Sequence, residues 1–453
     1  MFKKVLIANR GEIAARIAKT TRRMGIASVG VFSEADAGAP HTALADEAFL
    51  IGPAPVSQSY LDQTRILEVA RESGCDALHP GYGLLSENTE FIKQVKQAGL
   101  TFIGPSPESV ALMGDKARAR AFAHQAGVPV VPGSQGEIVD ESQALAFAEE
   151  FGYPVIVKAA AGGGGIGMKV ANKEKRLKKA MAECMRRAES AFGSSKIYLE
   201  RYIENPRHVE IQVLADHHGN ALHLFERECT IQRRHQKVIE ETPSILMSRH
   251  QDLREQMTQA ALRLVEASGY VNAGTVEFIV DEAGNFYFIE MNTRLQVEHA
   301  VTEMTTGLDL VELQLTVAAG GALPVSQADI ALDGHAIECR VYAEDPGKMF
   351  MPAPGEIGAY REPQITGIRV DSGVKSNWRV TPDYDPMLAK VIAHGATREE
   401  ASKKMIEGLG QMQLEGLTNN INMHIAVLNT AAFRNGDFHT GWLEDWTTLT
   451  GAQ

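Results

Sequence analysis

The feature that most constrains the fold is a pair of strand-like runs, residues 275–280 and 285–290, joined by a short turn rich in Asp, Gly and Asn. Such a turn favours a hairpin, so the two runs should pair antiparallel and bring Glu277 and Glu290 near one another. Two carboxylates with Asn292 close by suit the oxygen coordination that Mg²⁺ or Mn²⁺ prefers. The sequence therefore predicts a metal site formed by Glu277, Glu290 and Asn292.

The segment 290–298 carries an acid, an amide or a guanidinium at every second position. In an extended segment these side chains project to one face, because side chains alternate along a strand. The residues on that face are Glu290, Asn292, Arg294, Gln296 and Glu298. Burying such charges is costly unless each finds a partner. The row is therefore either a solvated strand edge or part of a site whose other members lie elsewhere in the chain.

A glycine-rich loop lies upstream of the hairpin, between two further strand-like runs, 153–158 and 168–170. The first run ends in Lys158, and residues 162–167 are glycine except for Ile166. Glycines let backbone N–H groups approach phosphates closely, and Lys158 can add a point charge. No Gly-Lys-Ser/Thr follows, so the loop is not a P-loop of the Walker type. A flexible linker is the alternative, but the flanking strands favour a triphosphate site.

The first 115 residues alternate short apolar strands with helical segments. Residues 4–8, 12–24 and 28–32 have a strand–helix–strand pattern, which predicts a parallel, doubly wound sheet. The turn after the first strand lacks the full Gly-x-Gly-x-x-Gly fingerprint, so NAD binding is not expected. The long charged segment 172–187 is consistent with a small mobile lid. After Gly334 the chain is rich in β-type runs before a terminal helix.

Composition excludes several functional classes. The chain has 453 residues and a formal net charge of -12, which argues against nonspecific nucleic-acid binding. Its four cysteines form no Cys-x-x-Cys pair and are expected to be reduced thiols, not a disulfide framework or a zinc site. No apolar run approaches the ~18 residues of a membrane span. We therefore expect a cytoplasmic enzyme without membrane or nucleic-acid partners.

The order of these parts resembles the ATP-grasp superfamily and, more closely, the biotin carboxylase component of biotin-dependent carboxylases. The resemblance covers nearly the whole chain, and its specificity comes from the shared order of several short motifs. The motifs are residues 9–13 (NRGEI), 79–88 (HPGYGLLSEN), 113–116 (MGDK), 205–212 (NPRHVEIQ), 232–237 (QRRHQK), 338–340 (ECR) and 384–387 (YDPM).

The fold that the resemblance implies is α/β and α+β. It predicts an N-terminal doubly wound domain at 1–115, a linker and ATP-grasp lid at 116–203, a catalytic core at 204–334, and a mixed C-terminal domain at 335–453. The resemblance also implies ATP-binding positions: two lysines at the phosphates, the glycine loop, an adenine hinge, and further residues near the ribose. These are Lys116, Lys158, Gly163, Gly164, Gly165, Glu200, Tyr202, Ile203, His208, Gln232 and His235.

In this family ATP phosphorylates bicarbonate to carboxyphosphate, which then carboxylates N1′ of biotin. The resemblance assigns bicarbonate binding to Arg294, Gln296, the backbone at Val297 and Glu298. Glu298 matches the base that removes the bicarbonate proton. A planar guanidinium such as that of Arg294 suits a planar anion.

The remaining roles concern charge and biotin. Lys237 is expected to neutralise charge on the transferring oxygens, Arg340 to stabilise the ureido oxygen of biotin, and Tyr82 to line the biotin pocket. Each residue alone is a weak signal. The basic run 233–237 also fits a solvated strand, His208 a structural histidine, and Tyr82 a core residue.

The chain departs from its relatives at a few positions. Ile166 stands where biotin carboxylases often have Arg or Lys, which removes a possible phosphate contact. Ala300 stands where many have Pro, and the composition of residues 376–379 is unexplained.

The expected partners are a second copy of the chain in a homodimer, a biotin carboxyl carrier protein and a carboxyltransferase subunit. The sequence has no biotin-attachment motif, so the carrier is expected either as a separate chain or in a part of the protein beyond this sequence. The carboxyl acceptor stays open among an acyl-CoA, a 2-oxo acid and urea.

Two other functions share some of these features. An ATP-grasp ligase joining a carboxylate to an amine or thiol needs Lys158, the glycine loop and the metal pair, but not Arg340 or the Arg294–Glu298 pocket. A noncatalytic nucleotide-binding subunit needs even fewer of these residues. Every candidate catalytic side chain is present in this sequence, which argues against that function.

Overall fold

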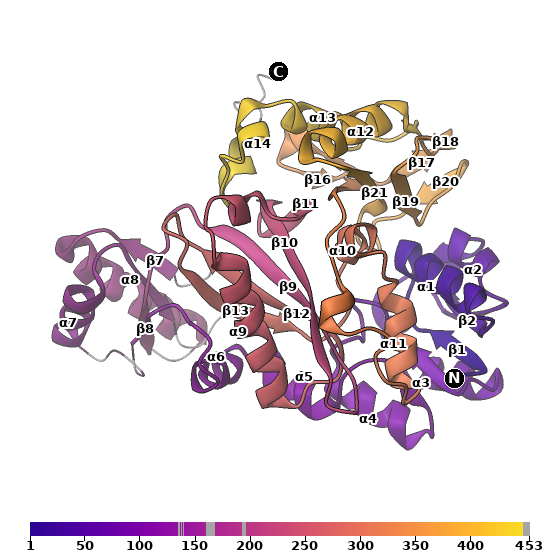
Figure 1. Cartoon of the computed structure of the whole chain (residues 1–453), viewed down its shortest axis with the longest axis horizontal. Coiled ribbons are helices and arrows are strands. Elements are labelled where there is room, and N and C mark those ends of the chain that lie inside the picture. Colours follow the sequence, from indigo (N-terminus) through magenta and orange to yellow (C-terminus); the bar gives the residue numbers. More distant parts are fainter. Residues whose placement is uncertain (135, 137, 139, 160–167, 193–195, 447–453) are drawn as a thin grey trace. The chain divides into compact units, whose positions relative to one another are not determined.

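The computed structural model describes residues 1–446 except 135, 137, 139, 160–167 and 193–195 (Figure 1). The chain divides into two compact units. Unit 1 comprises Met1–Val128, Arg207–Ile279 and Ile289–Gln453, and unit 2 comprises Pro129–Pro206 and Val280–Phe288. Among the described helices, none combines the length and the apolar character that crossing a membrane requires.

The N-terminal part of unit 1 is built on a parallel five-stranded sheet with the order β3-β2-β1-β4-β5. Its strands are β1 (Lys4–Ile7), β2 (Ala27–Ser33), β3 (Glu47–Gly52), β4 (Ala77–His79) and β5 (Thr101–Phe102). The helices of this part are α1 (Gly11–Arg23), α2 (Pro40–Leu44), α3 (Gln63–Glu72), α4 (Thr89–Gln97), α5 (Pro107–Gly114) and α6 (Lys116–Gln125). The predicted strand–helix–strand pattern and the parallel sheet are confirmed.

Helix α1 shows why these elements form where they do. Ile13 and Ile17 stand one turn apart and are both buried, which gives the helix an apolar side to pack against the rest of the unit. Glu12 lies in its first turn and Arg22 and Arg23 in its last, the charge arrangement that the helix dipole favours.

Unit 2 has its own three-stranded antiparallel sheet, in the order β7-β6-β8. The strands are β6 (Val155–Ala159), β7 (Met168–Ala171) and β8 (Ile197–Arg201), and the helices are α7 (Glu141–Phe151) and α8 (Glu174–Phe192). The two strands predicted around the glycine loop are thus confirmed. The loop itself, with Gly163, Gly164, Gly165 and Ile166, lies outside the described residues.

A larger sheet carries most of the predicted site. Its order is β13-β12-β9-β10-β11-β14-β21-β19. The strands are β9 (Arg207–Ala215), β10 (Ala221–Arg233), β11 (Gln236–Thr242), β12 (Asn272–Val280), β13 (Phe286–Asn292), β14 (His335–Tyr342), β19 (Ile368–Ser372) and β21 (Met387–Gly395). Helix α9 (Leu253–Ser268) packs on β9 and β10, and α10 (His299–Thr306) and α11 (Leu310–Ala318) follow the hairpin in sequence.

The predicted hairpin is confirmed, but its extension to residue 298 is wrong. Strands β12 and β13 are neighbours, and the Asp281 N–H donates to the Asn285 carbonyl across the turn (2.9 Å). Strand β13 ends at Asn292. The next donors, the Thr293 N–H and the Arg294 Nε–H, bind the carboxylate of Glu87 (3.0 and 2.9 Å) instead of a neighbouring strand. The backbone therefore leaves the sheet before α10.

The C-terminal part adds three small two-stranded sheets to β14, β21 and β19. Their strands are β15 (Glu344–Asp345), β16 (Met351–Pro352), β17 (Gly355–Ile357), β18 (Tyr360–Arg361), β20 (Trp378–Val380) and β22 (Gln413–Leu414). The described helices here are α12 (Arg398–Gln411), α13 (Ile421–Leu428) and α14 (Ala431–Asn435). The β-rich character is confirmed, whereas the single terminal helix that the sequence predicted is instead a series of three.

A buried ion pair ties α12 to the large sheet. Glu241 of β11 accepts hydrogen bonds from the Nε and Nη2 of Arg398 (2.6 and 3.0 Å), and its carboxylate lies 2.7 Å from the Nε2 of His335. Burial alone would raise the pKa of Glu241, but Arg398 and His335 lower it to about 2. The ionised form of Glu241 is therefore favoured by folding.

We predict that Glu241→Gln destabilises the protein in a pH-dependent way. Because the folded-state pKa lies below the ordinary value of 4.5, the charge stabilises the fold above pH 4.5, and this contribution is lost as the pH falls toward 2. Breaking a buried pair typically costs roughly 3–5 kcal/mol. Urea unfolding should show a difference of about that size at pH 7, shrinking below pH 4.5. A difference that is constant with pH would assign the effect to packing.

Candidate active site

One face of β9 carries several polar residues of the candidate site. All nine residues of this strand are buried. Apolar Val209 and Ile211 alternate with His208, Glu210 and Gln212, so the three polar side chains share one face. Buried polar groups are stable only when they are hydrogen-bonded or paired. The partners of this row come from the neighbouring strands and from the segment before α10.

Lys237 of β11 is held by three carboxylates. Its Nζ donates to Glu210 Oε2 (2.5 Å), Glu277 Oε1 (2.9 Å) and Glu298 Oε1 (2.7 Å). Burial by itself would lower the pKa of Lys237, but the three carboxylates raise it well above its ordinary value. The side chain is therefore an ammonium ion, and it does not belong to a solvated basic strand.

Glu298 lies between two cations. Its Oε1 accepts from Lys237, and its Oε2 accepts from the Nη2 of Arg340 (2.9 Å). Burial alone would raise the pKa of Glu298, but Lys237 and Arg340 lower it well below its ordinary value. The Nε of Arg340 is buried and has no hydrogen-bond partner within the part of the chain that the structure describes. Glu298 is thus ionised, and Arg340 retains a donor for another acceptor.

Glu240 is a further buried acid beside this pair. Its Oε1 lies 2.5 Å from the Nη2 of Arg340, although neither of its carboxylate oxygens has a hydrogen bond of good geometry among the described residues. Burial raises the pKa of Glu240 to about 7; Arg340 opposes this rise and Glu298 adds to it. Glu338 stands directly opposite Glu240 on β14, and burial raises its pKa well above the ordinary value. The pKa values of these two carboxyl groups are thus raised, whereas the pKa of Glu298 is lowered.

The segment before α10 folds back onto Glu277. Asn292 Nδ2 and Gln296 Nε2 both donate to Glu277 Oε1 (2.7 Å each). The Nη2 of Arg294 donates to Asn292 Oδ1 (2.7 Å), and the carbonyl of Val297 accepts from Lys390 Nζ (2.5 Å). The predicted bicarbonate residues are therefore gathered, although by a turn and not by an extended strand.

Arg227 holds this arrangement in place through several hydrogen bonds. Its guanidinium is fully buried and is opposite Glu210 in the register of β9 and β10. It donates to Glu210 Oε1 (2.5 Å), Gln212 Oε1 (2.7 Å), Gln296 Oε1 (2.8 Å), Thr302 Oγ1 (3.0 Å) and Thr275 Oγ1 (3.2 Å). One planar cation thus orients Gln296 and satisfies five acceptors.

The predicted metal ligands have the chemistry that a hard cation needs. Glu277 is buried; burial would raise its pKa, but Lys237 and His208 lower it well below the ordinary value, so it is ionised. Glu290 is partly exposed and pairs with Lys116 Nζ (2.9 Å). Asn292, as placed, presents its NH₂ to Glu277. The two carboxylates suit Mg²⁺, and Glu277 and Glu290 would hold it.

The spacing of ligand atoms in the structure groups residues that differ from the predicted metal ligands. Among the described residues, the clusters with closely spaced ligand atoms are His208–Glu210–Glu277 and Glu210–Cys229–Glu298. Lys237 already contacts the three carboxylates of these clusters. A lysine ammonium therefore neutralises charge at the place where such clusters would bind a cation.

The predicted ATP residues divide between the two units. In unit 1, Lys116 has a side chain that is 79% exposed, and the Nε2 of His208 lies 2.8 Å from Glu277 Oε2. Gln232 Nε2 is 3.3 Å from His208 Nδ1, and His235 is exposed in the turn between β10 and β11. His208 contacts Glu277, a predicted metal ligand, and Gln232 contacts His208, whereas His235 lies at the hairpin end.

In unit 2, Lys158 of β6 forms an ion pair with Glu200 of the adjacent strand β8. Tyr202 and Ile203 follow β8; the Tyr202 N–H donates to the Pro154 carbonyl (2.9 Å), and Ile203 is buried. The predicted phosphate lysine and adenine hinge are therefore neighbours within this unit.

Tyr82 lies in the turn after β4. Its hydroxyl donates to Glu12 Oε1. Asn9 Nδ2 donates to the carbonyls of Pro80 (2.7 Å) and Tyr82 (2.8 Å), which fixes the turn. Tyr82 thus makes specific polar contacts and is not only a packing residue.

Sequence reasoning assigned no role to several residues that hold the site. Glu87 binds Arg294, Glu12 binds Tyr82, and Glu210, Arg227 and Lys390 are buried charges inside strands. The available signal was a charged residue within an otherwise apolar strand run, which must have a buried partner. The partner itself could not be named, because it lies far away in sequence.

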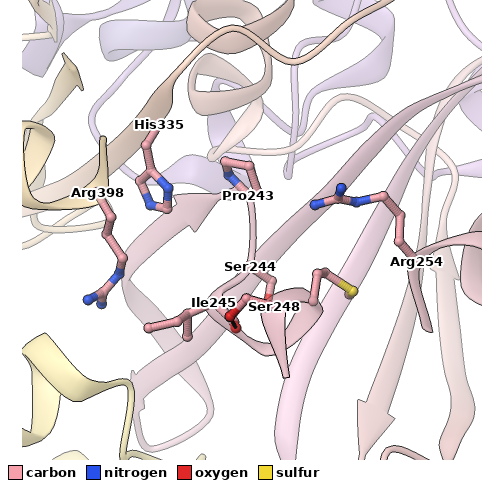
Figure 2. A pocket seen from close by; sticks show the side chains of 8 residues that line it. Pro243, Ser244, Ile245, Ser248, Arg254, His335 and Arg398 are labelled. Atoms are coloured by element: carbon pink, nitrogen blue, oxygen red, sulfur yellow. Dashed lines mark hydrogen bonds between the residues drawn. The ribbon is translucent and has the colours of Figure 1, made fainter. Parts of the chain in front are cut away.

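A surface cavity of about 340 Å³ lies within unit 1, and Figure 2 shows it from close by. Arg254, His335 and Arg398 are among its lining residues, and none of the described lining residues belongs to the predicted site. Arg254 pairs with Glu226 (2.7 Å) and Arg398 with Glu241 (2.6 Å). Both guanidinium groups are therefore already neutralised.

Comparison with known proteins identifies the family of the chain. The family model "Biotin carboxylase, N-terminal domain" matches residues 1–110, "Carbamoyl-phosphate synthase L chain, ATP binding domain" matches 115–326, and "Biotin carboxylase C-terminal domain" matches 338–445. Biotin carboxylase 2 of Bacillus subtilis is 53% identical over 98% of this chain and 99% of its own length. The biotin carboxylase of Halalkalibacterium halodurans is 52% identical over 98% of this chain and 97% of its own length.

Among solved structures, the chain is similar to the biotin carboxylase domain dimer of Hydrogenobacter thermophilus 2-oxoglutarate carboxylase, which contains MgADP, ADP and bicarbonate. The identity is 45%, the TM-score is 0.89, and the match covers 99% of both chains. The biotin carboxylase subunit of a pyruvate carboxylase gives a TM-score of 0.91 at 46% identity and covers 100% of both.

The fold is that of an ATP-grasp enzyme. The chain belongs to the biotin carboxylase family. The predicted family, fold and enzyme class are therefore confirmed, and the alternative of an ATP-grasp ligase of another kind is not supported.

Proposed function

We propose that the chain uses ATP and bicarbonate to carboxylate biotin on a carrier, through carboxyphosphate, and that the residues gathered around Glu298 carry the reaction. The observation that carries this proposal is the position of Glu298. It is a buried, ionised carboxylate held between Lys237 (2.7 Å) and Arg340 (2.9 Å), and Arg340 keeps an unused buried N–H among the described residues. The base Glu298 is thus placed between Lys237, a cation suited to phosphoryl oxygens, and Arg340, a cation suited to a planar acceptor.

The first step is bicarbonate activation. Arg294, Gln296 and the Val297 backbone would hold bicarbonate beside Glu298, which removes its proton while its oxygen attacks the γ-phosphorus and ADP leaves. Bound bicarbonate adds a negative charge next to Glu298 and shares Lys237 with it. Both effects raise the pKa of Glu298 from its low value toward that of an effective base.

The second step uses the other cation. Carboxyphosphate breaks down to CO₂ and phosphate, and the released phosphate takes the N1′ proton of biotin. The negative charge then lies on the ureido oxygen, where Arg340 would stabilise it, while Tyr82 would line the biotin pocket. N1′ attacks CO₂ to give carboxybiotin.

The remaining parts of the proposal concern nucleotide, metal and partners. Lys116, Lys158, Glu200, Tyr202, Ile203, His208, Gln232 and His235 are proposed for ATP, together with the glycine loop. Mg²⁺, held by Glu277 and Glu290, would neutralise phosphate charge. A homodimer, a biotin carboxyl carrier protein and a carboxyltransferase subunit are the proposed partners. The cytoplasmic location and the four-part domain division stay predictions.

We predict that Glu298→Gln retains ATP affinity but loses bicarbonate-dependent ADP formation by roughly 10²- to 10⁴-fold, because the amide keeps the shape and cannot accept a proton. Glu303→Gln is the matched control: Glu303 is also buried and paired, with Arg16 (2.7 Å) and Arg369 (2.7 Å), but has no predicted role in the site. Near-normal turnover of Glu298→Gln across the pH range would remove Glu298 from the role of base.

We further predict that Arg340→Ala separates the two steps. The variant should bind ATP and retain slow bicarbonate-dependent ATP cleavage, while biotin no longer stimulates it, because the ureido oxygen loses its cation. ADP formation with and without biotin, measured beside nucleotide affinity, gives the test. Loss of ATP affinity with intact biotin stimulation would place Arg340 in the nucleotide site instead.

A further inference from the structure

Lys390 is a buried cation that the proposed reaction leaves without a role. It lies in the middle of β21, and its side chain is 0% exposed. Its Nζ donates to the Val297 carbonyl (2.5 Å) and lies 3.5 Å from Glu12 Oε1. The same oxygen of Glu12 accepts from the Tyr82 hydroxyl. Three contacts therefore connect Tyr82 to Val297 through two buried charges.

The N-terminal sheet explains why Glu12 and Tyr82 meet. Strands β1 and β4 are parallel neighbours, and the strand order reverses direction at β1. Glu12 follows the carboxyl end of β1, and Tyr82 follows the carboxyl end of β4. Ligands of open parallel sheets bind at this switch point. The Tyr82 end of the connection therefore lies where such a fold places a ligand.

At the other end of the connection, Lys390 donates a hydrogen bond to a backbone peptide group. The Val297 carbonyl belongs to the peptide that joins Val297 to Glu298, so its bond to Lys390 fixes both the proposed bicarbonate backbone and the proposed base. A hydrogen bond from an ionised donor is about twice as strong as a neutral one. Residues 293–298 lie outside any strand, so sheet hydrogen bonds do not hold this peptide.

The surroundings of Lys390 show that it is retained as a cation. In the sheet register it faces Arg340 on β14 and Asp371 on β19. Burial would lower the pKa of Lys390, but Glu12, Glu338 and Asp371 raise it above its ordinary value. A charged donor is thus maintained at full burial.

We propose that Lys390 is a positioning residue: it holds the Val297–Glu298 peptide for bicarbonate and, through Glu12, couples that peptide to the biotin pocket at Tyr82. This inference rests on the proposed function and adds to it a link between the two substrate sites. Biotin that engages the Tyr82 hydroxyl changes the partners of Glu12, and Lys390 transmits the change to the peptide that carries the base.

The test uses the double variant Glu12→Gln/Lys390→Met, which removes both charges and leaves neither buried alone. The KM for bicarbonate in ADP formation should rise about 10- to 100-fold, because small misplacements of a reacting group have effects of this size. The KM for ATP should change little, and the melting temperature shows whether the variant stays folded, since Lys390 also interacts with the buried acids Glu338 and Asp371. Lys404→Met is the matched control, since Lys404 also donates to a backbone carbonyl, that of His394 (3.0 Å), but lies on α12.

The single variant Glu12→Gln tests the coupling and also serves if the double variant does not fold. It keeps the Lys390–Val297 bond, so the KM for bicarbonate should stay within about threefold, while stimulation of ADP formation by biotin should fall at least about tenfold, again as expected for misplacement of a reacting group. Unchanged biotin stimulation would overturn the coupling, and an unchanged bicarbonate KM in the double variant would overturn the positioning role. Absence of bicarbonate-dependent ADP formation in the unmodified protein would instead refute the proposed function.

Discussion

The structure depends on burying many charged side chains on one sheet and pairing most of them with an opposite charge. Around the candidate site, Glu210, Glu277, Glu298 and Glu240 face only three strong cations among the described residues, Lys237, Arg227 and Arg340. Desolvating an unpaired carboxylate is costly, so the excess acid must take up a proton. Burial raises the pKa of Glu240 to about 7 and that of Glu338 well above its ordinary value, so both carboxyl groups favour the protonated form more than Glu298 does.

This arrangement holds the residues of the candidate site in place through contacts within the protein. Each cation contacts more than one acid or amide, and together these contacts join different parts of the fold. Lys237 connects β9, β12 and the segment before α10, while Arg227 connects β9 and β12 with that same segment. An anionic substrate would therefore replace existing charge contacts instead of creating a charged site from solvent.

Much of the fold follows from local patterns. The hairpin of β12 and β13, the strands that flank the glycine loop and the parallel N-terminal sheet were predictable, because each depends on side-chain alternation and turn residues within a short segment. The path of the chain after Asn292 was not, since the contact that diverts it, from Thr293 and Arg294 to Glu87, joins distant parts of the sequence.

The same limit applies to the site. Lys237, Arg294, Glu298 and Arg340 were proposed as site residues from short motifs that resemble a known family. The residues that hold them, such as Arg227, Glu210 and Lys390, give no motif, and their sequence context shows only that a charge stands in a buried strand. Their roles come from contacts that only the three-dimensional structure provides.

The most direct test of the account is the rate of ADP release from MgATP by the unmodified protein, measured with and without bicarbonate and with and without free biotin. The account predicts that release requires bicarbonate and increases further with biotin, because Glu298 acts on bicarbonate and Arg340 on biotin. Turnover without bicarbonate, driven by another carboxylic acid, or nucleotide binding without any turnover, would contradict it.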